Sequence, residues 1–200
     1  MTGASGEIDQ VKAAMRARIL AGRRAMASEE RAAAGRLLRD TLLEMPEMQM
    51  AGTIAAYASV GHEPDTRALL FALWKRGSYV LLPVLLRDGD LDWASYEGPD
   101  SLASGPRGLA EPAEPRRGVI AITSADLVIV PALAADWSGT RLGRGGGSFD
   151  RALARVGAAV PTVALLYDGE LLASGQIPAG PLDQRVRCAA VPAEGICRLA

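Results

Sequence analysis

Asp126-Leu-Val-Ile-Val-Pro-Ala-Leu-Ala-Ala-Asp-Trp-Ser-Gly-Thr-Arg-Leu-Gly-Arg-Gly-Gly-Gly-Ser-Phe-Asp-Arg151 is the stretch that decides the fold. It opens with an apolar run at 126–131, which predicts a buried strand. A glycine-rich loop follows and leads into a segment that predicts a helix over 148–156. A buried strand, a loop and a helix in succession are the repeating step of an α/β protein with a parallel sheet.

The same step occurs on the N-terminal side of this stretch. Residues 53–59 predict a strand, and a turn through Gly61 and Pro64 leads into a helix over 65–76 that ends at Gly77. Further strands are predicted at 78–85, 91–96, 162–167 and 188–192. The sequence therefore predicts a layered α/β fold with a mostly parallel central sheet flanked by helices. Ligands of such sheets gather beyond the carboxyl ends of the strands.

Two helices are predicted ahead of the first strand. Apolar residues recur at helical spacing between residues 8 and 25, and basic residues fill other positions of this helix. The apolar set is Ile8, Val11, Met15 and Ile19, and the basic set is Lys12, Arg16, Arg18, Arg23 and Arg24. Ser28 is expected to cap a second helix over 29–44, which has an acidic first turn and is followed by Pro46.

The length and composition are those of a globular protein. With 200 residues, we expect one domain over 1–200, in which the proline- and glycine-rich segment 97–118 forms a long surface loop able to close over a ligand. The net charge of -1 gives no overall attraction to nucleic acid or to an anionic membrane. No apolar run suits a signal peptide or a membrane span, so we expect a cytoplasmic location. We also expect a monomer. Cys188 and Cys197 are expected to be reduced.

The glycine loop suits an anionic ligand. Gly143, Gly145, Gly146 and Gly147 lack a Cβ, so a phosphate group can approach their backbone N–H groups at the start of a helix. Arg141 and Arg144 would add fork-shaped contacts to phosphate oxygens. The segment matches neither the P-loop pattern nor GxGxxG, because residue 148 is Ser. A flexible glycine hinge with solvated arginines is the alternative interpretation.

Residues 126–151 resemble the signature of the 5-formyltetrahydrofolate cyclo-ligase family, approximately DLxxVPGLAFDxxGxRLGxGxGYYDR. Three other segments agree with that family in order and spacing: the basic N-terminal helix, Tyr57–Thr66, and Gly108-Leu-Ala-Glu-Pro112. The resemblance covers about residues 8–192. It implies an ATP- and Mg²⁺-dependent enzyme that forms a C–N bond by converting 5-formyltetrahydrofolate to 5,10-methenyltetrahydrofolate, with release of ADP and phosphate.

The resemblance also implies roles for individual residues. Lys12 and Arg144 would be catalytic, Asp150 and Asp183 would bind Mg²⁺, and Glu63 would hold the folate. The implied ATP site consists of Lys12, Arg16, Arg141, Leu142, Gly143, Arg144, Gly145, Gly146, Gly147, Ser148 and Phe149. The implied folate site adds Arg144, Gly145, Gly146, Gly147 and Ser148 to Glu63.

Four of these residues also have a simpler interpretation. Lys12 and Arg16 could lie on a solvated basic face, Glu63 could be an exposed turn residue, and Asp150 could cap a helix. Ser148-Phe149 replaces the usual Tyr-Tyr of the family, and Ala135 replaces an aromatic residue. These departures leave two alternatives open: a diverged homologue that binds nucleotide or folate without turnover, and an isomerase-like enzyme acting on a sugar phosphate.

Overall fold

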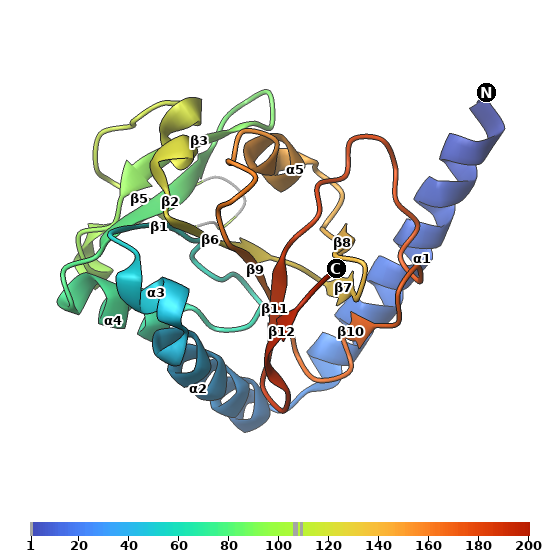
Figure 1. Cartoon of the computed structure of the whole chain (residues 1–200), viewed down its shortest axis with the longest axis horizontal. Coiled ribbons are helices and arrows are strands. Elements are labelled where there is room, and N and C mark those ends of the chain that lie inside the picture. Colours follow the sequence, from blue (N-terminus) through green and yellow to red (C-terminus); the bar gives the residue numbers. More distant parts are fainter. Residues whose placement is uncertain (1, 106–107, 109) are drawn as a thin grey trace.

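The protein's structure is a computed structural model that describes residues 2–105, 108 and 110–200. Its main sheet joins seven strands (Figure 1). In spatial order they are β12 (Gly195–Arg198), β11 (Cys188–Val191), β9 (Thr162–Leu165), β6 (Leu127–Pro131), β1 (Thr53–Ala55), β2 (Tyr79–Leu85) and β3 (Leu91–Ser95). The five inner strands run parallel, whereas β12 and β3 pair antiparallel at the two edges. The predicted mostly parallel α/β fold is confirmed.

Alternation along the strands builds one core on each face of the sheet. On one face, Ile129 and the other strand side chains that point the same way pack against the helices α2 (Ser28–Glu44), α3 (Pro46–Met50) and α4 (Arg67–Lys75). Val128 and Val130 face the other way and pack against α5 (Ser148–Leu153) and the 3-10 helix η3 (Val119–Ser124). Successive side chains of a strand point to opposite faces, so a continuous apolar run is what a doubly covered sheet requires.

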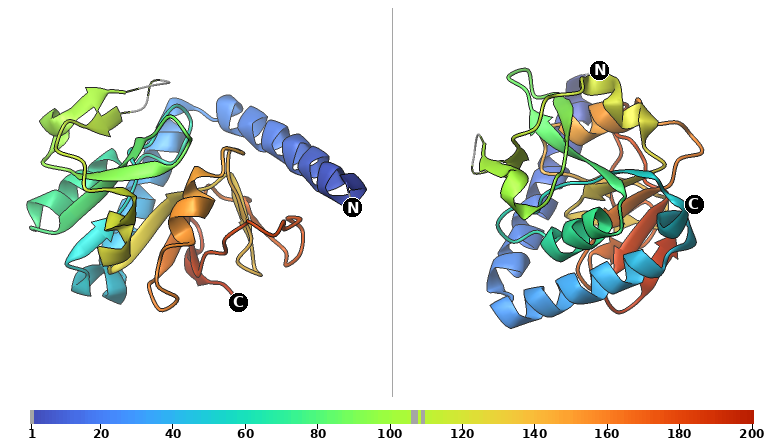
Figure 2. Two further views of the ribbon diagram at one scale, coloured as in Figure 1. Left: turned by 90° about the horizontal axis from the view of Figure 1, so that it is seen from above. Right: turned by 90° about the vertical axis from the view of Figure 1, so that its left-hand side faces the viewer.

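The first helix, α1 (Thr2–Ala25), lies apart from these layers, and its N-terminal end projects away from the sheet (Figures 1 and 2). It runs beside a small second sheet of β10 (Leu171–Leu172), β7 (Ala134–Asp136) and β8 (Arg141–Leu142). Met15, Ile19 and Leu20 are half-buried against the apolar side chains of this second sheet. Val11, predicted to lie on the buried face, is 44% exposed. The N-terminal half of α1 therefore does not pack its apolar side chains against the main core.

Several predicted boundaries were wrong for local reasons. Ser28 is the first residue of α2 and its hydroxyl contacts Glu29, while Ala27 is the N-cap residue and makes no side-chain cap. Pro46 begins α3 as well as following α2, since a proline suits the first helical position. The first strand ends at Ala55, and α5 ends at Leu153, three residues before the predicted limit.

Segment 97–118 was predicted to be a loop without regular elements, but it contains regular structure. It contains the 3-10 helix η1 (Pro99–Ser101) and an antiparallel pair, β4 (Leu102–Ser104) with β5 (Ala110–Pro112). Residues 106, 107 and 109 of this segment, with part of the Gly108–Pro112 motif, lie outside the described residues. The Glu111 carboxylate accepts a hydrogen bond from the Leu85 N–H at 2.9 Å, so the segment is attached to the end of β2.

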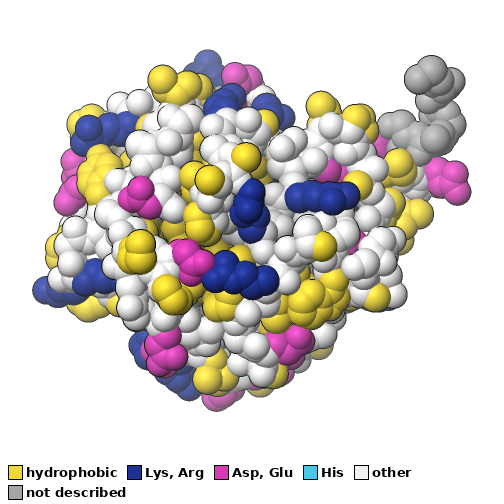
Figure 3. All heavy atoms as spheres, viewed as in Figure 1, with side chains coloured by type: hydrophobic (Ala, Val, Ile, Leu, Met, Phe, Trp, Pro, Cys, Tyr) yellow, Lys and Arg dark blue, Asp and Glu magenta, His cyan; other side chains and the backbone are white. Residues whose placement is uncertain are grey.

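Cys188 and Cys197 are both buried, and neither forms a disulfide within the described residues. Within residues 2–105, 108 and 110–200, none of the helices is both long and apolar enough for a membrane span. Figure 3 shows lysine and arginine side chains spaced among apolar, acidic and uncharged groups on the viewed face, which fits the net charge of -1.

Candidate functional site

The glycine loop lines a cavity of about 400 Å³ beyond the carboxyl end of β6, where ligands of parallel sheets are expected. Its walls come from the ends of β1, β2 and β6, from the loop and from the start of α5. The lining residues are Tyr57, Ala58, Val60, Glu63, Pro83, Leu85, Leu91, Ala110, Pro131, Ala132, Leu133, Arg141, Gly143, Arg144, Gly145, Gly146, Gly147, Ser148, Phe149 and Asp150. Ala110 belongs to segment 97–118, so this segment does contribute to the cavity.

The loop presents unused donors. Within the described part of the chain, no hydrogen bond is donated by the backbone N–H groups of Gly143 to Gly147. Gly145 (φ 101°) and Gly147 (φ 68°) occupy the positive-φ region that side chains disfavour. Consecutive free N–H groups in such a loop form a concave binding site for anions. The following helix α5 is only six residues long, so its dipole adds less than the sequence led us to expect.

Replacing Gly147 by alanine is expected to destabilise the fold by about 1–2 kcal/mol, because the left-handed conformation strains any other residue. Thermal unfolding would show a Tm several degrees lower. Gly157→Ala is the matched control, because that glycine has no positive φ and an added Cβ would make only an ordinary contact at 3.6 Å. Equal Tm values for the two variants would contradict the expectation.

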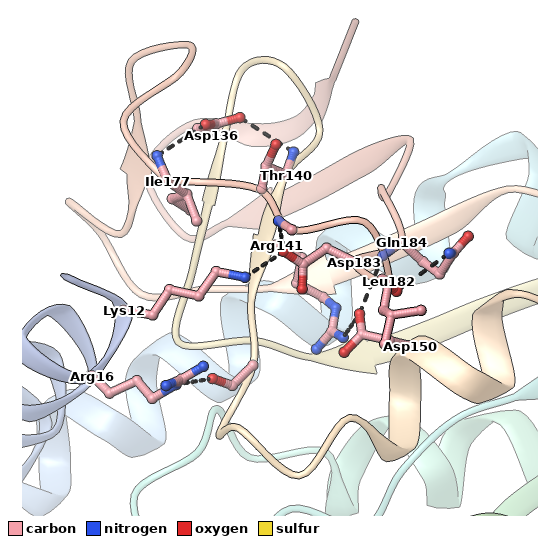
Figure 4. A network of polar contacts seen from close by, with 12 residues as sticks. Lys12, Arg16, Asp136, Thr140, Arg141, Asp150, Ile177, Leu182, Asp183 and Gln184 are labelled. Carbon is pink, nitrogen blue, oxygen red and sulfur yellow. Dashed lines mark hydrogen bonds and ion pairs between the residues drawn. The ribbon is translucent and has the colours of Figure 1, made fainter. Parts of the chain in front are cut away.

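Two basic side chains of α1 reach the loops beside the cavity (Figure 4). Lys12, 6% exposed, forms an ion pair with Asp183. Arg16 donates from Nε to the carbonyl of Gly143 at 2.9 Å. Neither side chain is solvated as a free basic face would be, and the spacing of four residues places both on one side of the helix. Lys12, Arg16 and Asp183 lie next to the cavity but outside its lining.

A second ion pair, between Arg141 and Asp150, lies in the lining of the cavity. Arg141, 4% exposed, donates from Nη2 to Asp150 Oδ1 at 2.8 Å and from Nη1 to the carbonyl of Pro131 at 3.1 Å. The N–H of Gln184 donates to the same oxygen of Asp150 at 3.3 Å. Burial tends to raise the pKa of Asp183, but hydrogen bonds from Lys12 and the Gly180 N–H hold it below the ordinary value. Both predicted metal ligands are therefore neutralised by a basic side chain.

Glu63 and Arg144 form a third ion pair, which joins the glycine loop to another part of the cavity wall. Arg144 Nε lies 3.0 Å from Glu63 Oε1, and the Val60 N–H donates to Glu63 Oε2 at 2.9 Å. The Arg144 side chain is 51% exposed, whereas that of Glu63 is 7% exposed. Burial raises the pKa of Glu63, and the Val60 N–H and Arg144 only partly oppose the rise. Glu63 is thus a buried, directed acceptor and not an exposed turn residue.

The raised pKa of Glu63 predicts a pH-dependent stability. Folded Glu63 keeps its proton to a higher pH than the same residue of the unfolded chain. Its contribution to the free energy of unfolding is therefore full below the ordinary glutamate pKa and is lost as pH rises through the folded pKa. The free energy of unfolding of Glu63→Gln, measured by denaturant titration across this window, should rise relative to wild type as pH increases. Glu44→Gln, at an exposed position, controls for the lost charge. Parallel profiles for wild type and Glu63→Gln would refute the expectation.

The other predicted residues have different positions. Leu142 is 1% exposed, its side chain packs in the small apolar cluster, and its carbonyl accepts the Leu133 N–H at 2.8 Å. It lies outside the cavity lining. Ser148 is the first residue of α5, and Phe149 lines the cavity while packing against both cores. Tyr57 was not singled out from the sequence; it is buried in the cavity wall, and its hydroxyl has no hydrogen-bond partner among the described residues. The quoted Tyr57–Thr66 motif contains it, but nothing in the pattern distinguished it from a core aromatic residue.

Asp136 was also missed, although its carboxylate holds the backbone of the turn that precedes the glycine loop. Its buried carboxylate accepts hydrogen bonds from the backbone N–H groups of Ser138, Thr140, Gly175 and Ile177. Figure 4 shows the bonds from Thr140 and Ile177. The tight turn after Asp136 in the sequence is the signal that could have identified it, since Asp commonly bonds the backbone two residues ahead. This carboxylate joins the β7–β8 turn to the chain that leads to Asp183.

The fold and this geometry define an α/β protein with a glycine-loop cavity bordered by three pairs of basic and acidic side chains. Residues 8–192 match the model of the 5-formyltetrahydrofolate cyclo-ligase family, and the chain belongs to that family.

Known relatives support the assignment. A 5-formyltetrahydrofolate cyclo-ligase of Mycolicibacterium smegmatis is 38% identical over 194 residues, which cover 94% of this chain and 97% of the relative. One from Escherichia coli is 35% identical over 133 residues, covering 66% and 73%. The NMR structure of a 5,10-methenyltetrahydrofolate synthetase from Aquifex aeolicus superimposes with a TM-score of 0.81 at 26% identity, covering 94% of this chain and 93% of that one. Relatives named as ligases and synthetases support an enzyme of folate chemistry.

Proposed function

We propose that this protein converts 5-formyltetrahydrofolate to 5,10-methenyltetrahydrofolate at the expense of ATP, with release of ADP and phosphate. The observation that carries the proposal is the 3.0 Å ion pair between Arg144 of the glycine loop and Glu63 of another part of the cavity wall. A loop suited to phosphate and a carboxylate suited to pterin N–H groups thus border one cavity. Transfer between two ligands requires such proximity.

The chemistry needs positioning and charge neutralisation more than a strong acid or base. The formyl oxygen forms a bond to the γ-phosphorus of ATP as the bond from that phosphorus to ADP breaks. N10 then bonds to the formyl carbon, the carbon–oxygen bond breaks to release phosphate, and the N10 proton is lost. Free backbone N–H groups and the guanidinium of Arg144 suit the charge on the transferred group.

The three ion pairs also suit this role. Lys12, Arg141 and Arg144 are paired with Asp183, Asp150 and Glu63, so a carboxylate balances each basic charge. A triphosphate would give these basic groups new partners and release the carboxylates for other contacts. Arg16 would exchange the Gly143 carbonyl for a phosphate oxygen in the same way.

Asp150 and Asp183 fit a magnesium ion that binds together with the nucleotide. In the described contacts, Oδ2 of Asp150 and Oδ1 of Asp183 accept no hydrogen bond, so each carboxylate keeps one hard oxygen available. No group of three or more His, Cys, Asp or Glu forms a metal cage among residues 2–105, 108 and 110–200. In proteins, Mg²⁺ is usually bound by one or two carboxylates together with phosphate oxygens of the substrate. When bound, the ion would neutralise phosphate charge.

A spectrophotometric assay tests the proposed function. Purified protein with 5-formyltetrahydrofolate, ATP and Mg²⁺ should produce the near-ultraviolet absorbance of methenyltetrahydrofolate, and omission of any one component should abolish it. Folded protein that gives no product but binds nucleotide or folate would instead indicate a homologue without turnover. The monomeric state, the cytoplasmic location and a single domain over 1–200 remain predictions beside this proposal.

A further inference from the structure

Helix α1 is attached to the protein mainly by charged side chains. Between residues 6 and 25, whose side chains are described, only Lys12 and Arg23 are buried, at 6% and 2% exposed. The apolar residues Met15, Ile19 and Leu20 are half-buried. A helix held mostly by apolar packing would bury its apolar stripe instead. The position of α1 therefore depends on where its basic side chains find partners.

Arg23 has the most extensive contacts of these side chains. It forms a bidentate ion pair with Glu170, from Nε to Oε1 at 2.8 Å and from Nη2 to Oε2 at 2.7 Å. The same Nη2 donates to the carbonyl of Ala132 at 2.7 Å, and the guanidinium lies 5.2 Å from the centre of the Tyr167 ring. Glu170 is also fixed, because its Oε2 accepts the Tyr167 N–H at 2.8 Å. Paired forks of this kind restrict orientation as well as distance.

These contacts end at the wall of the candidate site. Ala132 lines the cavity, and its carbonyl is held by Arg23 while the preceding carbonyl, of Pro131, is held by Arg141. Two arginines from different elements thus fix two consecutive carbonyl groups at the end of β6. The buried pair therefore connects α1 directly to the strand end from which the glycine loop departs.

Arg23 differs from Lys12 and Arg16 in one respect. Lys12 pairs with the proposed metal ligand Asp183, and Arg16 bonds to the carbonyl of Gly143 in the proposed ATP site, so a nucleotide with Mg²⁺ would displace both contacts. Glu170 belongs to neither site. Arg16 and Arg23 are two helical turns apart and Lys12 and Arg23 about three, so all three lie on one side of α1. The Arg23–Glu170 pair would remain as the fixed attachment while Lys12 and Arg16 change partners.

We propose that Arg23 and Glu170 are positioning residues, which hold α1 so that Lys12 and Arg16 reach the phosphates of the nucleotide. The inference rests on the proposed function, because it assigns a purpose to the location of the two α1 side chains. Neither residue touches the nucleotide. The pair acts through the helix and through the carbonyl of Ala132.

The test uses the full-length double variant Arg23→Met/Glu170→Gln, which leaves no buried unpaired charge and keeps an oxygen for the Tyr167 N–H. We expect its affinity for adenylyl imidodiphosphate with Mg²⁺, measured by calorimetry, to fall about tenfold. We also expect amides of residues 8–20 to exchange hydrogen about tenfold faster without nucleotide. Arg24→Met, at the exposed neighbouring position, is the matched control and should change neither quantity. Arg23→Lys keeps the charge without the fork and serves if the double variant fails to fold.

The outcomes separate this inference from the proposed function. Wild-type exchange of α1 in a folded variant overturns the inference, and so does an unchanged nucleotide affinity when the wild-type protein binds well. If the wild-type protein itself binds no nucleotide, the proposed function is the idea that fails, and the exchange rates of α1 still report whether the pair positions the helix. Faster exchange of α1 together with weaker nucleotide binding supports the inference.

Discussion

Arg144→Ala is expected to lower kcat by about 100- to 1000-fold while leaving Tm almost unchanged. The Arg144 side chain is 51% exposed, so it contributes little to the core, and the Val60 N–H still bonds the Glu63 carboxyl group after the guanidinium is removed. Its guanidinium nevertheless lies at the meeting point of the glycine loop and Glu63, where the phosphoryl group would pass. Steady-state kinetics and thermal unfolding of the same preparation give the two quantities.

Two further variants sharpen this prediction. Arg36→Ala removes an exposed arginine from α2 and should alter neither kcat nor Tm. Arg144→Lys keeps the charge but loses the planar fork, so its kcat should fall between those of wild type and Arg144→Ala. If Arg144→Ala turned over normally while its Tm dropped, Arg144 would be a structural residue and the proposed role would be wrong.

Lys12→Met is expected to weaken binding of an ATP analogue by about 100-fold, because it removes a buried cation next to the loop. The methionine retains most of the packing of the lysine stem. Asp183 loses its ionic partner but keeps the Gly180 N–H as donor, so the protein should remain folded with a modest loss of stability. Isothermal titration calorimetry with and without Mg²⁺ measures the affinity.

The second lysine of the chain provides the matched control. Lys75 lies at the end of α4 over the rings of Phe71 and Trp74, so Lys75→Met removes the same charge at a different surface. It should bind the analogue as the wild type does. The combination Lys12→Met/Asp183→Asn removes both charges. In titrations without Mg²⁺, where Asp183 has no metal to bind, recovery of stability without recovery of affinity would assign the affinity loss to Lys12. Equal affinities of Lys12→Met and wild type would exclude Lys12 from the nucleotide site.

Much of the main sheet was predictable because its strands and helices carry strong local patterns. The run at β6 is apolar on both faces and gave a correct strand, and Gly77 correctly marked the end of α4 through its positive φ. The antiparallel edge strand β12 and the second sheet were missed. β8 and β10 contain two residues each, and pairing between residues far apart in sequence, not local propensity, creates them.

The candidate site was predictable as a set of residues but not as a set of contacts. The glycine loop and its arginines follow from a contiguous motif, whereas the partners Glu63 and Arg144 come from distant segments. Arg23 was assigned to the polar face of a helix, because single-sequence periodicity treats every arginine as solvated. Its burial follows from Glu170, whose position only the folded chain reveals. Buried ion pairs of this kind are therefore what sequence patterns identify least well.

We propose that ATP phosphorylates the formyl oxygen of the folate at this site. Oxygen-18 in the formyl group of 5-formyltetrahydrofolate can be followed into the released phosphate by mass spectrometry during a single round of turnover. One oxygen-18 atom should appear in each phosphate formed, because the carbon–oxygen bond breaks after phosphoryl transfer. Phosphate released without the label, while methenyltetrahydrofolate accumulates, would contradict it.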